Sequence, residues 1–159
     1  MWYRIPILAA AGAAALAACG TDGIQVSAPE TTVGFASGAS GHGEDDGALF
    51  IAVELTTALT AIEQPVSVTV TDGLSGSATS GADYVPFAPT EVSFPAGTAS
   101  GSTALVRFTA LGDDLAEGNP ETVRLVLNDA SGASLGSVSE TQISLVDTER
   151  ADVRFERPS

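Results

Sequence analysis

From residue 48 onward, apolar residues recur at every second position, the pattern of β-strands with one buried face. This alternation predicts strands at residues 48–56, 65–71, 103–110, 122–128 and 141–146. Turns that contain glycine or proline separate these segments. After the N-terminal region, no stretch has the 3.6-residue apolar period of a helix. The sequence therefore predicts an all-β fold, and about seven short strands close most naturally into an antiparallel sandwich.

Residues 84–94, YVPFAPTEVSF, contain two prolines that cannot donate hydrogen bonds to a sheet. We therefore expect an edge strand or an interrupted one that crosses the sandwich once. If every strand is a single antiparallel crossing, successive strands reverse direction, and one pole of the sandwich collects the segments that carry most of the acidic residues. The carboxylates expected to gather there are Glu44, Asp83, Asp113, Asp114, Glu117 and Asp147.

The segment LGDDLAEGNPE, residues 111–121, carries four carboxylates and no cation. Most charge runs of this kind are solvated surface loops. The predicted convergence of other acidic segments at the same pole argues instead for a cation site. Carboxylates supply the hard oxygen ligands that such a site needs.

Residues 20–47 have a different composition, rich in glycine, serine, alanine and threonine with few apolar residues. GTDGIQVSAPETT, residues 20–32, is typical of a flexible tether. ASGASGHGEDDG, residues 36–47, is typical of a mobile loop.

The first twenty residues have the features of an export signal. Arg4 precedes an apolar run, residues 5–18, that is too short to span a bilayer comfortably. Leu16-Ala17-Ala18-Cys19 resembles the bacterial lipobox, and Cys19 is the only cysteine in the chain. The resemblance implies a signal peptide at 1–18, a lipidated Cys19, and a lipid-anchored protein of the cell envelope. Gly20 at the next position favours the outer membrane.

The formal net charge is −14, and the chain contains no lysine. Nucleic acid is excluded as a partner, because affinity for a phosphate backbone depends on basic contacts. Cations and basic surfaces remain possible partners. The lipid anchor at Cys19 would itself make a membrane the first partner, and a protein or cell-surface partner is expected for an adhesive role.

Five elements along the chain resemble the motifs of Calx-β domains, and they occur in the family order. GEDDG (43–47) resembles the opening E-G-D-G, and SATSGADY (77–84) resembles T-A-x-x-G-S-D-Y. VSFPAGTASGSTALVRF (92–108) resembles the stretch that follows in the family. DDLAEGNPETVRLVL (113–127) resembles D-D-x-x-E-x-x-E-x-F-x-x-x-L, and ISLVDTE (143–149) resembles V-x-I-x-D-x-D.

This resemblance implies a seven-stranded immunoglobulin-like sandwich at residues 31–149 that binds Ca²⁺ at one end. The tether would then occupy 19–30 and a C-terminal tail 150–159. By position in the family motifs, the expected ligands are Glu44, Asp83, Asp113, Asp114, Glu117 and Asp147. The closing motif departs from the family, because Thr148 stands where further aspartates are common. This departure predicts one ion, or two weakly bound ions.

Two alternatives remain at this point. The same acids could merely keep the surface of a metal-free scaffold or binding module soluble. More distantly, the chain could be an envelope hydrolase that uses His42, its only histidine, beside a serine. No G-x-S-x-G nucleophile motif is present, and zinc chemistry lacks its preferred ligands. We therefore expect a non-enzyme.

Overall fold

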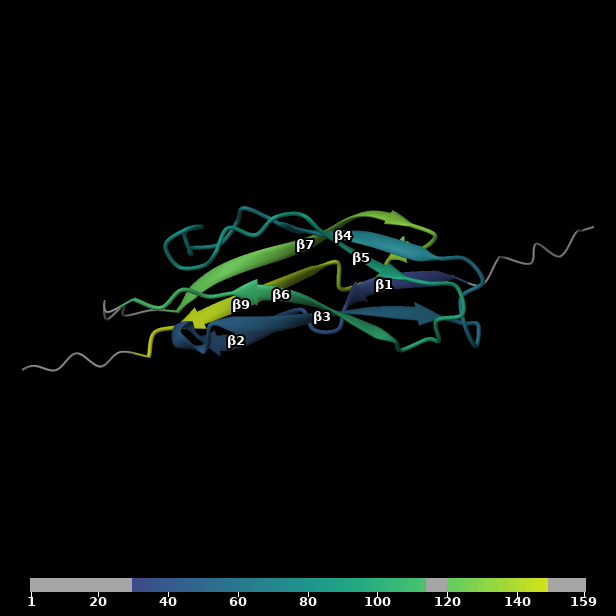
Figure 1. The fold of residues 1–159 in the computed structure, drawn as a ribbon, viewed down its shortest axis with the longest axis horizontal. Helices are drawn as coiled ribbons and strands as arrows, with labels where there is room; N and C mark the ends of the chain where they lie inside the picture. The colour runs from purple at the N-terminus through teal and green to yellow at the C-terminus, as the bar shows by residue number, and fades with distance from the viewer. Residues whose placement is uncertain (1–29, 114–119, 149–159) are drawn as a thin grey trace, which may run out of the picture.

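A computed structural model of the chain describes residues 30–113 and 120–148. The predicted signal peptide, Cys19, most of the tether and the tail at 150–159 lie outside these residues. The described residues form nine strands and one short 3₁₀ helix, arranged as two packed sheets (Figure 1). The elements are β1 (Thr31–Phe35), β2 (Ala39–Gly43), η1 (Glu44–Asp46), β3 (Ala48–Thr57), β4 (Val66–Asp72), β5 (Thr90–Phe94), β6 (Thr103–Thr109), β7 (Glu121–Ser131), β8 (Ser134–Leu135) and β9 (Glu140–Val146).

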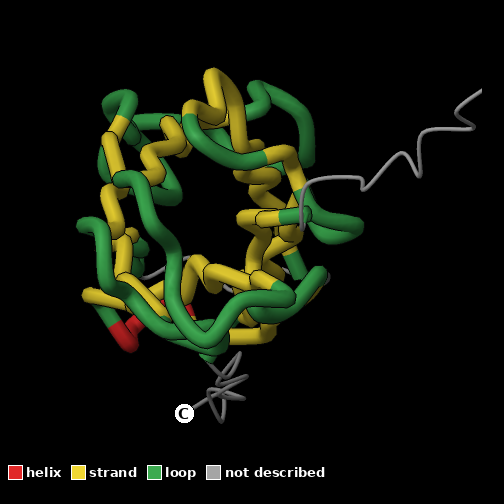
Figure 2. The backbone as a smooth tube through the Cα atoms, turned by 90° about the vertical axis from the view of Figure 1, so that its right-hand side faces the viewer, coloured by secondary structure: helices red, strands yellow, loops and turns green. Residues whose placement is uncertain are grey.

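The two sheets have the strand orders β6-β3-β1-β8 and β2-β9-β7-β4-β5. Viewed along the long axis, the strands surround a central space that the core side chains fill (Figure 2). Most pairings are antiparallel, whereas β1 with β8 and β2 with β9 are parallel. The predicted all-β sandwich is confirmed. The number of strands exceeds seven because the first strand is divided into β1 and β2 and because β8 adds a two-residue strand.

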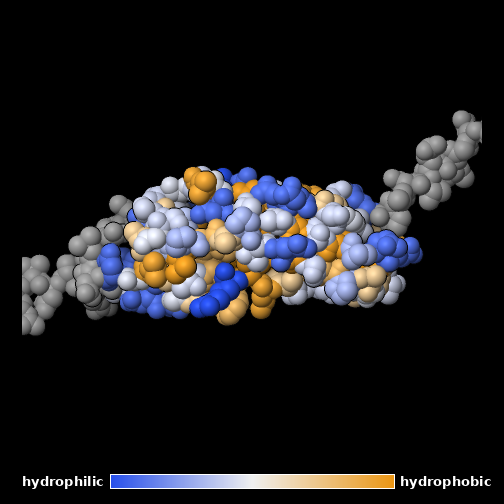
Figure 3. Space-filling view, turned by 45° about the horizontal axis from the view of Figure 1, so that its top comes forward, coloured by the Kyte–Doolittle hydropathy of each residue, from blue (hydrophilic) through white to orange (hydrophobic). Residues whose placement is uncertain are grey.

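The core follows from the alternating pattern. In β3 and β4, the buried residues occupy every second position and face the opposite sheet. The largest side chains with almost no exposure are Phe108, Leu55, Leu125, Leu127 and Ile143. On the face shown in Figure 3, hydrophobic residues reach the surface as separate patches among hydrophilic ones. No helix in the described part of the chain is long and apolar enough to cross a membrane.

The prediction that residues 36–47 form a mobile loop is wrong. Residues Ala39–Gly43 form β2, which pairs in parallel with β9 from Ala39↔Gln142 to Gly43↔Val146. The next three residues form η1. The glycine-rich sequence did not indicate the strand, because β2 is held by main-chain hydrogen bonds to β9 and has no apolar face of its own.

The expectation of a single interrupted crossing at 84–94 is confirmed. Tyr84 forms an isolated bridge to Ala110 at the end of β6, and only Thr90–Phe94 forms a strand. That strand pairs antiparallel with β4 at the edge of the other sheet. The two prolines lie in the linking residues between the sheets, where no ladder hydrogen bond is required of them.

Candidate metal centre at the acidic pole

The sheet registers bring several acidic segments to one pole, at the left end in Figure 1. Ala48 at the start of β3 pairs with Thr109 at the end of β6, and Glu121 at the start of β7 pairs with Leu145 near the end of β9 (Figure 1). Four of the predicted residues therefore lie in segments that end or begin at this pole: Glu44, Asp83, Asp113 and Asp147. Asp114 and Glu117 lie outside the described residues.

Asp45 connects three of the segments at this pole. One of its carboxylate oxygens, Oδ2, accepts a hydrogen bond of 2.6 Å from the hydroxyl of Thr148, which follows β9. The other, Oδ1, lies so close to Gly112 that a side chain at Gly112 would overlap it. Asp45 thus lies between Gly112, which directly precedes Asp113, and Thr148, which follows β9. Sequence reasoning selected its neighbour Glu44, although the GEDDG motif already contained the signal for Asp45.

The turn that carries Asp45 is held by its own hydrogen bonds. The Asp46 Oδ2 atom accepts a 2.8 Å hydrogen bond from the main-chain N–H of Gly43, which precedes the 3₁₀ helix. Asp45 and Asp46 are both exposed, whereas Glu44 is half-buried and its Oε1 atom is shielded from solvent. Three consecutive carboxylates are therefore placed in one turn, with one directed inward and two outward.

Asp83 is positioned at the pole by hydrogen bonds to main-chain groups. Its carbonyl oxygen accepts a 2.9 Å hydrogen bond from the N–H of Leu111, the first residue of the acidic segment 111–121. Its carboxylate accepts a hydrogen bond from the N–H of Thr79. Asp83 is therefore joined through the backbone to Leu111, two residues before Asp113.

The described carboxylates do not by themselves form a compact ligand set. Within residues 30–113 and 120–148, no three or more His, Cys, Asp or Glu side chains are grouped so that they could hold a metal ion. The available donors are nevertheless of the right chemical kind, since carboxylate, hydroxyl and carbonyl oxygens are the ligands of Ca²⁺. The role of the six predicted residues as ligands stays a prediction.

The loop between β4 and Tyr84 packs closely on the first residues of β7. Ser77 and Thr122 exchange main-chain to side-chain hydrogen bonds of 3.1 and 3.0 Å. Gly76 has φ +133°, and a Cβ atom at this position would overlap the carbonyl oxygen of Thr122. Only glycine permits both this backbone conformation and this close approach. The loop at residues 73–83 is therefore held against the start of β7.

Tyr84, which directly follows this loop, attaches it to the core. Its ring is 3% exposed and stacks on Phe108 with 5.4 Å between ring centroids, and its hydroxyl donates a 2.7 Å hydrogen bond to Asp72 Oδ2. Burial, followed by the hydrogen bond to Asp72 and its negative charge, raises the pKa of Tyr84 to about 12. The neutral phenol is thus the form that the folded protein stabilises.

The raised pKa of Tyr84 predicts a loss of stability in alkali. Because the folded pKa of about 12 exceeds the ordinary value of 10.0, this contribution is complete below pH 10 and falls as the pH rises toward 12. We expect the free energy of unfolding of the wild type to fall more steeply over this range than that of Tyr84→Phe. Denaturant titrations at successive pH values measure it. Identical slopes for the two proteins would contradict this assignment.

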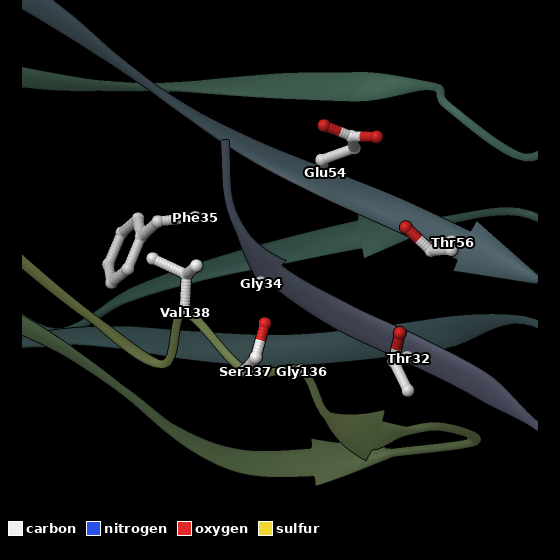
Figure 4. Close-up of a pocket in the computed structure, with 8 residues that line it drawn as sticks. All are labelled: Thr32, Gly34, Phe35, Glu54, Thr56, Gly136, Ser137 and Val138. Carbon is white, nitrogen blue, oxygen red and sulfur yellow. The ribbon is translucent and has the colours of Figure 1, made fainter. Parts of the chain in front are cut away.

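Two hollows are lined by none of the predicted ligands. The first, of about 240 Å³, follows β1 and the residues after β8, and its lining is shown in Figure 4. It contains one carboxylate, Glu54 of β3, and gives no cluster of ionisable groups (Figure 4). The second, of about 280 Å³, is lined by Ala36, Ser37, Ser40, His42, Phe50, Ile51, Ala52 and Thr141.

The second hollow contains the residue types that a serine hydrolase would use, a histidine and serines. Ser40 and His42 pair with Ile143 and Leu145 of β9, so their side chains share the inward face of the sheet. However, the Ser40 Oγ atom is buried without a hydrogen-bond partner. Its proton is therefore not directed to His42, and the geometry gives no support to a serine nucleophile.

No protein-family model and no curated protein sequence matches the chain. The crystal structure of the apo-form Calx CBD1 domain has 22% sequence identity and a TM-score of 0.66, covering 76% of this chain and 99% of that one. The Calx CBD2 domain has 11% identity and a TM-score of 0.60, covering 74% and 87%. The fold is Calx-β-like.

A third Calx structure supports the same conclusion. The calcium binding domain CBD12 of CALX1.1 has 23% identity and a TM-score of 0.62, covering 72% of this chain. The match covers 44% of the CBD12 chain, so this chain accounts for less than half of that protein. The Calx-β-like fold expected from the sequence motifs is therefore confirmed. None of the three structures is described as an enzyme.

Proposed function

We propose that this chain is a cell-envelope lipoprotein whose Calx-β-like domain binds Ca²⁺ at the acidic pole and serves a structural or adhesive role. The observation that carries the proposal is the junction at Asp45, where the opening turn, the start of the acidic run and the end of the closing strand lie together. The similarity to a structure named as a calcium binding domain supports it.

Electrostatics explains why a cation belongs at this pole. The carboxylates of η1, Asp83, Asp113 and Asp147 come from segments that meet there, and the chain has no lysine to compensate them. A bound divalent cation would be the largest local charge and would remove this repulsion. The half-buried Glu44, Asp83 and Asp147 and the exposed Asp45 and Asp113 would supply oxygens, together with Asp114 and Glu117. The ion would then fasten the loops of the pole to one another.

Thermal unfolding of the purified protein with and without Ca²⁺ tests the metal proposal. A ligand that binds only the folded state adds about 2.7 kcal/mol at a hundredfold excess over its Kd. For a domain of this size, that corresponds to a rise in Tm of about 10 °C. We expect this rise with millimolar Ca²⁺ and none with an equal ionic strength of Na⁺. An unchanged Tm at millimolar Ca²⁺ would refute Ca²⁺ binding.

The lipid anchor is tested separately. The lipobox-like sequence before Cys19 predicts that cells grown with radiolabelled palmitate incorporate label into the wild type and not into Cys19→Ala. The variant should also lose its membrane association, because acyl chains contribute about 0.8 kcal/mol per buried methylene. Label that persists in Cys19→Ala would rule out the anchor without affecting the Ca²⁺ proposal.

A metal-free binding module is the second candidate. The observation that favours it is the hydrogen bonding of η1, where groups of the protein itself already bond to Asp46 (from Gly43) and to Asp45 (from Thr148). In that case, the pole would be equally well ordered in chelator and in Ca²⁺. Hydrogen exchange of the amides of η1 and Thr148 in the two buffers distinguishes the candidates.

A further inference from the structure

The first sheet contains a vacancy, a position beside the first half of β3 that no strand of the described residues occupies. β1 pairs with β3 only from Val53 to Thr57, and its last pair is Phe35↔Val53. After one further hydrogen bond, from Ala36 N–H to the carbonyl of Ala52, the chain crosses to the other sheet and forms β2. β6 covers the opposite edge of β3 along its whole first half. Residues Ala48–Ile51 therefore have no neighbouring strand on the β1 side in the described structure.

The main chain of this edge is directed into the vacancy. In an antiparallel sheet, the peptide groups of alternate residues point to the same edge. Since Ala52 bonds toward β1 and Leu55 bonds toward the residues before β6, the peptide groups of Ala48 and Phe50 point to the β1 side. Exposed edges are usually blunted by charges, prolines or bulges. The sequence here, ALFIA from 48 to 52, contains none of these.

One polar side chain beside the vacancy lacks a hydrogen-bond partner, and apolar side chains are exposed at its rim. The vacancy opens onto the 280 Å³ hollow between β2 and β3, where the buried Ser40 hydroxyl has no hydrogen-bond partner. Buried hydroxyls are normally bonded, so such an atom is well suited to a ligand. Phe50 is 62% exposed at the rim, and Leu105, opposite Ala52 on β6, is 64% exposed. No aspartate or glutamate lines the hollow, despite the acidity of the chain.

We propose that this vacancy, the β3 edge slot defined by Ala48–Ile51, Ser40 and Phe50, binds an extended segment of a cationic partner polypeptide as an added strand. A strand in the slot would satisfy the peptide groups of Ala48 and Phe50, and its inward side chains would contact Ser40 and Ile51. A second copy of this chain is a poorer occupant, because two molecules of charge −14 repel each other. A basic partner is attracted by the same field. The proposal does not depend on Ca²⁺.

A model peptide tests the slot in Ca²⁺-free buffer, which separates this test from that of the metal site. The probe is a fluorescent peptide of alternating valine and threonine with two lysines at each end, and anisotropy measures its binding to the purified protein. We expect saturable binding that is weakened at least tenfold by Phe50→Lys, whose surface position preserves folding. Ser40→Trp, which fills the hollow, should have a similar effect, and Leu135→Lys, at the exposed β8, should have little.

The matched control peptide carries N-methyl groups at alternate residues, which remove main-chain donors but keep the charge and the side chains. Strand addition predicts at least tenfold weaker binding of this peptide. The proposal is overturned if the protein does not bind the first peptide or binds both equally. It is also overturned if Asp113→Asn weakens binding while Phe50→Lys does not, since this would place the cationic peptide at the acidic pole. If the wild type forms dimers and Phe50→Lys dissociates them, a second copy of the chain occupies the slot, and the proposal of a cationic partner is refuted.

Discussion

Replacing Asp113 and Asp114 together by asparagine is expected to abolish the Ca²⁺-dependent rise in Tm of about 10 °C. The substitution keeps the shape of both side chains but removes two of the negative charges from which Ca²⁺ binding derives its energy. In the absence of Ca²⁺, the variant should be as stable as the wild type or more stable, because fewer like charges meet at the pole. Differential scanning calorimetry in chelator and in millimolar Ca²⁺ measures both effects.

The matched control for this variant is Glu63→Gln. Glu63 is exposed in the connection between β3 and β4, at the end of the sandwich opposite the acidic pole. It should keep the full response to Ca²⁺. If Glu63→Gln reduced the response as much as the double variant, the effect of Ca²⁺ would be general charge screening and not site binding.

Gly112→Ala gives a second, geometric test of the same site. The added methyl group would overlap Asp45 Oδ1, so the carboxylate must move away from the acidic run. Because the net charge is unchanged, electrostatic screening alone predicts no effect. We expect Ca²⁺ to bind more weakly to this variant, by about tenfold. An unaltered affinity would remove Asp45 from the proposed ligands while leaving Asp113 and Asp114 in place.

Phe108→Ala is expected to produce the largest loss of stability, about 3–5 kcal/mol, by leaving a cavity in the core. Phe108 is 1% exposed and contacts the rings of Tyr84 and Phe87, at centroid distances of 5.4 and 6.5 Å. The expected fall in Tm is about 10–20 °C. Chemical denaturation gives the corresponding change in the free energy of unfolding.

Phe50→Ala is the matched control, since it removes the same side chain from the adjacent strand β3. Phe50 is 62% exposed on the outer face, where substitutions usually change stability by about 0.5 kcal/mol or less. Equal destabilisation by the two variants would show that the inward and outward faces of the first sheet are wrongly assigned.

The strands that could be predicted are those with a clear alternation of apolar and polar residues. The predicted segment 48–56 corresponds to β3, Ala48–Thr57, and 141–146 corresponds to β9, Glu140–Val146. These strands bury one face, so their positions in the chain are already visible as an alternation of apolar and polar residues. β2 was missed because a glycine-rich edge strand has no such pattern, and it forms only where β9 supplies hydrogen-bond partners.

The same distinction applies to the candidate site. The order of strands was enough to place Glu44, Asp83, Asp113 and Asp147 at one pole, since successive antiparallel crossings have only two possible ends. The contact of Asp45 with Gly112 and Thr148 was not predictable, because it depends on the turn formed by η1 and on the distance between the sheets. The unpaired half of β3 was equally hidden, since alternation shows which face is buried but not which edge is covered.

The sequence by itself therefore determined the all-β class, the Calx-β-like motifs and the high density of carboxylates near one pole. All three depend only on which residues follow one another along the chain, that is, on the two-residue apolar period and on the spacing of the acidic residues. The tertiary structure decided that Asp45 joins the opening, acidic and closing segments, and that β3 keeps an open edge beside Ser40. Both features arise where the chain leaves one sheet for the other, a step that depends on main-chain pairing between distant strands and leaves no periodic trace in the sequence.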